Sequence, residues 1–155
     1  MRDVTLEVIG TVRNGRESAA DQGWGDVVST LEIAPEFAAG LAGLESFTHV
    51  IVLFYMHLDP DPEPATLVRR PRGCADMPAL GVFAQRGRMR PNPVGITACE
   101  IVRLEPGRLV VRGLDAVEGT PVLDLKPYFP VFDRRDAARV PEWVGKLMKG
   151  YFDKG

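Results

Sequence analysis

Cysteine is scarce in this chain. Its 155 residues include only Cys74 and Cys99, and the two thiols stand at no paired spacing. This argues against a disulfide framework or a cysteine-based metal site and favours reduced thiols in a reducing cytosol. We therefore expect a cytoplasmic protein.

Long hydrophobic runs are also missing. The first ten residues, MRDVTLEVIG, carry charges inside their apolar pattern, and no later segment reaches the roughly 20 apolar residues that a bilayer span requires. We expect a soluble, unsecreted protein with no membrane contact.

Histidine is rare as well. His49 and His57 lie eight positions apart on one predicted strand, and a rise of about 3.3 Å per residue places them too far apart to share an ion. No third ligand is evident, so we expect no metal. A core position suits His49, whereas His57 at the strand end is placed to line a pocket or carry a proton.

No charge of one sign dominates. A formal net charge of −2 argues against nonspecific coating of nucleic acid, although a local basic patch remains compatible with it. The phosphate-binding GxxxxGK[ST] loop, the dinucleotide-binding GxGxxG and the nucleophile elbow are all absent. Nucleotide hydrolysis and serine-hydrolase chemistry therefore have no support.

Short segments rich in β-branched and aromatic residues recur along the chain and predict strands. These segments cover residues 4–12, 26–33, 48–58, 80–86, 95–104, 108–117 and 120–130. The run at 48–58 is apolar throughout, which predicts burial on both faces, and a Pro106-Gly107 turn predicts a hairpin. Residues 59–77 read as a long ordered loop.

Two segments predict helices. One covers residues 34–47, and the other covers the C-terminal residues 140–152, where an apolar stripe should dock on the domain or on a partner subunit. The sequence thus predicts a single domain over 1–155: a mainly β fold, a small β-barrel with one short internal helix and a C-terminal helix.

Six arginines gather in one window that contains a single acid, Asp76. They are Arg69, Arg70, Arg72, Arg86, Arg88 and Arg90. Guanidinium groups bind carboxylate or phosphate through paired charged hydrogen bonds, so the cluster suits an anionic ligand or an RNA backbone. The alternative is structural, with the arginines tying loop carbonyls together.

The segment RPNPVG, residues 90–95, is stiffened by its prolines. Each proline holds the residue before it extended, and Gly95 allows another backbone or a ligand to approach closely. Such a loop is suited to binding. Farther along, Asp115, Glu118 and Asp124 are placed to accept hydrogen bonds from ribose hydroxyls or an ammonium group. Asp115 and Glu118 could instead serve only the turn that they flank.

Five stretches of the chain together resemble a known family, the TsaA-like or TrmO-like proteins. They are IGTVR, LEIAPEFAAGLAGLESFTHVIVLFYMH, RPRG, GVFAQRGRMRPNPVGIT and GLDAVEGTPVLDLKPY, in the family's order. The resemblance implies an S-adenosylmethionine-dependent methyltransferase on a small β-barrel, acting as a homodimer. It implies that the acceptor is N6 of threonylcarbamoyladenosine, next to the anticodon of tRNA.

The resemblance also implies site residues. The cofactor S-adenosylmethionine would contact Leu58, Asp59, Arg86, Ile96, Gly113, Leu114 and Asp115, with a contribution from the loop at 22–25. Asp115 and His57 are the candidates for a catalytic base, and the RNA would meet Arg70, Arg72, Arg88, Arg90 and Asn92.

The chain also departs from the family pattern. It has QRGR where the family often has Thr-Arg-Ser-Pro, it has Glu118 where aspartate is usual, and it ends soon after the predicted barrel. Two alternatives therefore stay open: a methyltransferase that acts on a small molecule, and a noncatalytic module that binds S-adenosylmethionine.

Overall fold

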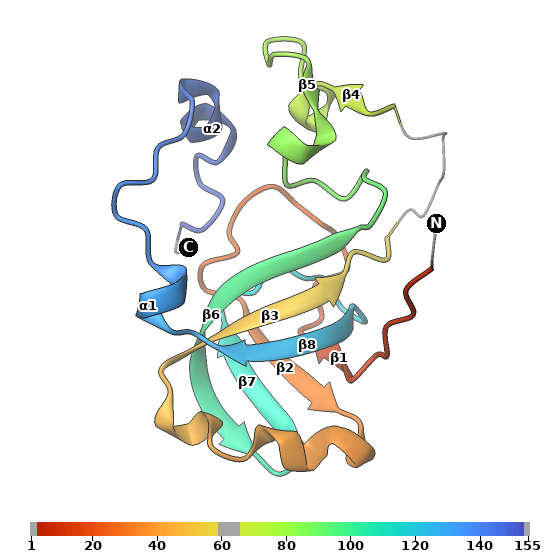
Figure 1. Ribbon diagram of the computed structural model, residues 1–155, viewed down its shortest axis with the longest axis vertical. Coiled ribbons are helices and arrows are strands. Elements are labelled where there is room, and N and C mark those ends of the chain that lie inside the picture. Colours follow the sequence, from red (N-terminus) through yellow and green to blue (C-terminus); the bar gives the residue numbers. More distant parts are fainter. Residues whose placement is uncertain (1–2, 59–65, 154–155) are drawn as a thin grey trace.

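A computed structural model describes residues 3–58 and 66–153. Within these residues, six strands close a barrel in the order β1-β2-β7-β6-β3-β8, and all neighbours are antiparallel (Figure 1). They are β1 (Gly10–Arg13), β2 (Val28–Ile33), β3 (His49–Tyr55), β6 (Val94–Glu105), β7 (Arg108–Arg112) and β8 (Pro121–Pro127). The predicted mainly β barrel is confirmed.

The core fills the inside of this barrel. On β3, Val50, Val52 and Phe54 are buried, whereas Ile51 and Leu53 between them are only half-buried. The prediction that this strand is buried on both faces is therefore wrong, because a strand of a small barrel has only one inner face. Other strands contribute the inward side chains Val12, Leu31, Cys99, Leu109, Val111 and Val122.

Glycines in the left-handed region set two of the turns. Gly107, with φ 69°, closes the predicted Pro106-Gly107 hairpin between β6 and β7. Gly113, with φ 86°, turns the chain away after Arg112, so β7 is shorter than the predicted strand over 108–117.

The helices are shorter than predicted. The segment 34–47 forms two 3-10 helices, η1 (Pro35–Leu41) and η2 (Leu44–Ser46), which are separated at Gly43 with φ 98°. The tail has α1 (Pro130–Asp133) and α2 (Glu142–Leu147), so the C-terminal helix is present but covers only part of 140–152. In the described part of the chain, no helix has the length and apolar character needed to cross a membrane.

Two predicted strands are largely absent. Residues 3–9 form no strand, and Val4, Leu6 and Val8 are exposed, because the ladder of β1 begins only at Gly10. Directly before it, Ile9 still bonds through its backbone to Val122 and Ala34. The strand expected over 80–86 is only β5 (Leu80–Gly81), followed by η4 (Val82–Ala84).

The segment predicted as a long loop contributes to a small two-stranded arm on the barrel. In the described part of the predicted loop 59–77, β4 (Val68–Arg69) pairs with β5, and η3 (Pro71–Gly73) follows it. Residues 67–84 are called the β4–β5 arm below; the arm projects beyond one end of the barrel (Figure 1).

Glu118 secures the turn after β1. Its Oε2 accepts hydrogen bonds from the backbone N–H groups of Asn14, at 2.6 Å, and Gly15, at 2.7 Å. Oε1 accepts one from Arg13 at 3.1 Å. The two backbone hydrogen bonds are the main reason why the pKa of Glu118 lies below its ordinary value. Glu118 thus has a structural role, although the turn that it secures is the one after β1 and not the one between Asp115 and Glu118.

The lowered pKa predicts a pH-dependent effect of Glu118→Gln. A carboxyl whose pKa is lower in the folded than in the unfolded chain stabilises the fold above about pH 4, and this stability is lost as the pH falls through the folded pKa. We expect Glu118→Gln to lower the melting temperature at pH 7 and to lower it less at pH 3. Glu7→Gln, on the exposed segment before β1, is the control. An equal loss at both pH values would contradict this role.

Candidate active site

The antiparallel barrel gathers the predicted site residues at one end. Tyr55 at the end of β3 pairs with Val94 at the start of β6, and Arg112 at the end of β7 pairs with Val28 at the start of β2. We call this end of the barrel the loop rim. His57 and Leu58 follow β3, residues 86–92 precede β6, and residues 113–115 follow β7, so all three groups lie at this rim.

Asp115 is held at the loop rim by hydrogen bonds to both of its carboxylate oxygens. Its Oδ1 accepts a hydrogen bond from the Thr97 hydroxyl, and its Oδ2 accepts one from the Tyr151 hydroxyl at 2.7 Å. Thr97 points into the barrel and is buried, whereas Asp115 is half-buried. A carboxylate offers about four acceptor positions, so two hydrogen bonds leave room for a ligand donor.

The Tyr151 hydroxyl remains a donor at neutral pH. Burial and the nearby negative charge of Asp115 raise the pKa of this phenol well above its ordinary value. The link from Tyr151 to Asp115 is therefore an O–H group that donates to a carboxylate.

Cys99 lies deeper in the barrel, and its side chain is fully buried. Burial, with a smaller contribution from the charge of Asp115, raises the pKa of its thiol far above the ordinary value. A thiol held in this neutral form is a poor nucleophile, so Cys99 is a core residue and not a catalytic one.

His57 belongs to a second group at the rim. It is half-buried, and its Nδ1 lies 3.4 Å from the hydroxyl of Thr120, which is itself buried. The contact with Thr120 orients the ring and engages Nδ1, not Nε2.

Three of the predicted arginines donate hydrogen bonds to backbone carbonyls of the protein itself. Arg86 donates to the carbonyl of Ile96 at 2.7 Å, Arg70 donates to the carbonyl of Met77, and Arg90 donates to that of Gln85 at 2.9 Å. These contacts support the structural reading that the sequence left open. A guanidinium has five N–H donors, so each arginine can still bind an anion.

The remaining residues predicted to contact RNA are Arg72, Arg88 and Asn92, and they have different surroundings. Arg72 pairs with Asp21 at 3.1 Å, and its guanidinium lies 5.9 Å from the centre of the Tyr151 ring. Arg88 is half-buried and Asn92 is exposed. Arg72 therefore links the β4–β5 arm to the group around Asp115.

The residues predicted to bind the cofactor differ in how far their side chains are exposed to a ligand. Leu58 is half-buried, Ile96 is 48% exposed, and Leu114 is fully buried in the barrel core, so Leu114 can offer a ligand only its backbone. Gly113 donates its N–H to the carbonyl of Val27 at 3.0 Å. Asp59 lies outside the described residues.

Gly95 has a different partner from the predicted one. A Cβ at this position would lie 2.3 Å from the Phe54 ring, so the glycine makes space for that core side chain. The space beside Gly95 is therefore occupied by a core side chain.

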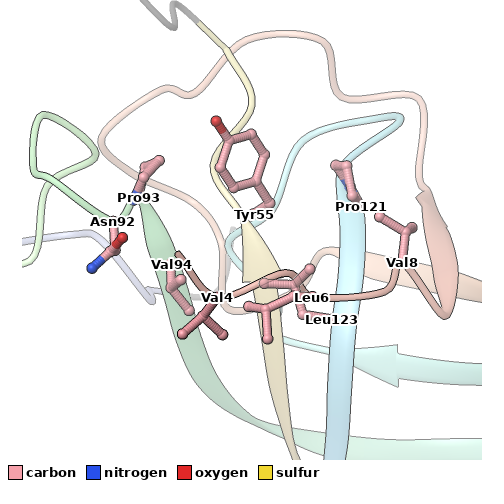
Figure 2. Close-up of a pocket in the computed structure, with 9 residues that line it drawn as sticks. All are labelled: Val4, Leu6, Val8, Tyr55, Asn92, Pro93, Val94, Pro121 and Leu123. Carbon is pink, nitrogen blue, oxygen red and sulfur yellow. The ribbon is translucent and has the colours of Figure 1, made fainter. Parts of the chain in front are cut away.

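An open apolar pocket lies outside the barrel, beside the proline loop. It has a volume of about 270 Å³, and Figure 2 shows its lining of Val4, Leu6, Val8, Tyr55, Asn92, Pro93, Val94, Pro121 and Leu123. None of these nine side chains is charged, so the pocket offers no counterion to a charged ligand. Across the described residues, no cluster of three or more histidine, cysteine, aspartate or glutamate side chains is arranged to hold a metal.

Tyr151 is the site residue that sequence reasoning missed. The sequence placed it on the apolar stripe of a helix, whereas it follows α2 and reaches Asp115. One signal was available: Gly23 and Gly25 flank Trp24, a composition that permits close approach of another backbone.

Comparison with known proteins identifies the family. Residues 16–134 match the model described as the tRNA-methyltransferase O N-terminal domain, and this match covers most of the chain. The chain therefore belongs to this family. The predicted TsaA-like or TrmO-like relationship is confirmed.

Individual relatives support the same assignment. The chain is 39% identical over 132 residues to the S-adenosyl-L-methionine-binding protein of Archaeoglobus fulgidus, a match that covers 83% of this chain and 91% of that one. It is 39% identical over 93 residues to the tRNA (adenine(37)-N6)-methyltransferase of Homo sapiens, covering 60% of this chain and 21% of that one. The crystal structure of TrmO from Pseudomonas aeruginosa superposes with a TM-score of 0.73 at 32% identity, covering 89% and 61%.

Other curated relatives are longer than the matched region. The match spans 62%, 43% and 38% of the length of three of them, from Pyrococcus abyssi, Pseudomonas aeruginosa and Archaeoglobus fulgidus.

Proposed function

We propose that this chain is an S-adenosylmethionine-dependent methyltransferase. On this proposal it methylates N6 of threonylcarbamoyladenosine next to the anticodon of tRNA. Family membership supports the reaction class, and the human relative is named for N6 methylation of adenine 37 in tRNA. The observation that supports the proposal is that the loops carrying the family-implied residues follow or precede strands at one rim of the barrel, where Thr97 and Tyr151 hold the Asp115 carboxylate.

The residues at the rim have the chemistry that S-adenosylmethionine requires. Asp115 has free acceptor positions for hydroxyl or ammonium donors, and Arg86 has free N–H groups for a carboxylate. When bound, S-adenosylmethionine supplies an electrophilic methyl group and leaves as a neutral thioether, so the reaction requires no metal. The protein's task is chiefly alignment of donor and acceptor, which can contribute up to about 7–11 kcal/mol.

The acceptor nitrogen loses a proton during methylation. Both oxygens of Asp115 accept hydrogen bonds inside the protein, which suits that side chain to binding. His57 is bound through Nδ1 and has Nε2 for the proton. We therefore assign donor binding to Asp115 and proton transfer to His57. The RNA would lie over Arg70, Arg72, Arg88 and Arg90 and the exposed Asn92. The reaction would take place in the cytoplasm.

Mass spectrometry of nucleosides tests the function. Purified protein is incubated with bulk tRNA and S-adenosylmethionine that carries a deuterated methyl group. We expect the label on threonylcarbamoyladenosine, and no label on tRNA from cells that cannot make that nucleoside. Label on another acceptor would contradict the proposed substrate. Donor binding without a labelled product would favour the noncatalytic module.

A homodimer is the second part of the proposal. Val131 and Phe132 of α1 are 80% and 69% exposed, and Phe129 and Val140 nearby in the chain are 39% and 68% exposed. Phe129 also stacks on Phe47, with ring centres 5.8 Å apart. An exposed apolar patch of this kind is typical of a protein contact.

Light scattering after size exclusion tests the homodimer. We expect twice the chain mass for the wild type and the chain mass for the double variant Val131→Asp, Phe132→Asp, because buried charges oppose association. Phe83→Asp is the control, since Phe83 on the β4–β5 arm is equally exposed at 79%. A monomeric wild type would contradict the homodimer, and a monomeric Phe83→Asp variant would move the interface to the arm.

A further inference from the structure

The chain continues beyond the family domain and returns to the loop rim. The family match ends at residue 134, shortly after α1, which lies beside the barrel (Figure 1) and follows the end of β8, where β8 pairs with the start of β3 away from the loop rim. After α2, residues 150–152 lie beside the loop at 22–25. We call residues 148–153 the tail.

The tail pairs with that loop through its backbone. Gly23 donates its N–H to the carbonyl of Gly150 at 3.0 Å, and Trp24 donates to that of Tyr151 at 2.9 Å. Trp24 is itself fixed, because its ring is buried and its Nε1 donates to the carbonyl of Ala20 at 2.7 Å. The tail is thus held against a well-anchored loop.

Gly25 shows that the sequence is adapted to this contact. A Cβ at this position would lie 2.0 Å from the carbonyl oxygen of Phe152, a distance that no side chain tolerates. Only glycine allows the tail to lie this close.

The backbone pairing of the tail places the Tyr151 side chain against Asp115 of the candidate site. The Tyr151 hydroxyl donates to Asp115 Oδ2 at 2.7 Å, and Arg72 lies over the Tyr151 ring while it pairs with Asp21. Thr97 holds the other oxygen of Asp115. The terminal torsion of an aspartate is broad, so two donors on opposite oxygens are what fixes its plane.

We infer that Tyr151 is a positioning residue for Asp115, and that the tail is therefore a part of the methyl-donor site. The inference rests on the proposed function. Tyr151 holds the carboxylate plane so that its remaining acceptor positions face the hydroxyl or ammonium group of the donor. A carboxylate oriented before binding loses less entropy when the ligand arrives, which increases affinity.

Calorimetric titration with S-adenosylmethionine tests the inference. Tyr151→Phe removes the hydroxyl and keeps the ring. Because hydrogen bonds to charged groups are among the stronger ones, we expect the variant to bind the donor about tenfold more weakly. Tyr128→Phe is the matched control, since Tyr128 follows β8 at the opposite end of the barrel, and it should bind as the wild type does.

Two further measurements separate positioning from a general loss of structure. Trypsin cleavage after Lys146 and Lys149 reports whether the tail is docked, and we expect the wild-type pattern for Tyr151→Phe because the backbone pairing remains. In the methylation assay, KM for the donor should rise about tenfold, as expected for a lost binding contact, while KM for tRNA stays unchanged.

Gly25→Ala tests the same link by another route. The added methyl group pushes the tail away and leaves Tyr151 in the chain, so this variant should also lose about tenfold in donor affinity. The double variant should be no weaker than either single one, because both act through one contact. Wild-type affinity for Tyr151→Phe would overturn the inference and leave the proposed function intact. A wild-type protein that binds no donor would overturn both.

Discussion

The closure of the barrel between β1 and β8 is the constraint on which the rest of the structure depends. The ladder joins only Gly10 to Val122 and Thr11 to Pro121, with a further backbone hydrogen bond from Val12 to Thr120. Without this contact the sheet would have two open edges, and nothing would hold the loops of the distant strands at a common rim. On its other side β1 fits closely against β2, because a Cβ at Gly10 would lie 2.5 Å from the carbonyl oxygen of Glu32.

Closure also explains how the site is assembled. His57, Asp115 and the proline loop lie far apart in the sequence, and each follows or precedes a strand at the loop rim. Strand β6 extends past β7, since their ladder reaches only Glu100 and Arg112, and Thr97 lies beyond that point. Thr97 is thus free to hold Asp115 from inside the barrel. The tail completes the group from outside with Tyr151.

The barrel was predictable because its strands carry strong local signals. The β-branched runs and the Pro106-Gly107 turn each indicate one local structure, and together they indicate a small closed sheet. The predictions that failed concern segments whose structure depends on distant partners. Residues 3–8 have the composition of a strand but belong to no ladder, and the helix expected over 34–47 is broken by the left-handed Gly43.

The family resemblance named candidate site residues, but it did not show what their side chains contact. The sequence indicated an arginine cluster, but only the structure shows that Arg70, Arg86 and Arg90 bind backbone carbonyls. Tyr151 was hidden for the same physical reason. Its hydrogen bond to Asp115 depends on a glycine at position 25 and a chain that returns from the far end of the barrel, and no local pattern encodes such a path.

Calorimetric titration of S-adenosylmethionine into Asp115→Asn and the wild type tests the central claim most directly. Asparagine keeps the size of the side chain and removes its charge. If Asp115 holds the donor, the variant should bind about tenfold to a hundredfold more weakly while its melting temperature stays close to that of the wild type. Equal affinity in the two proteins would contradict the account, because the donor site would then lie elsewhere.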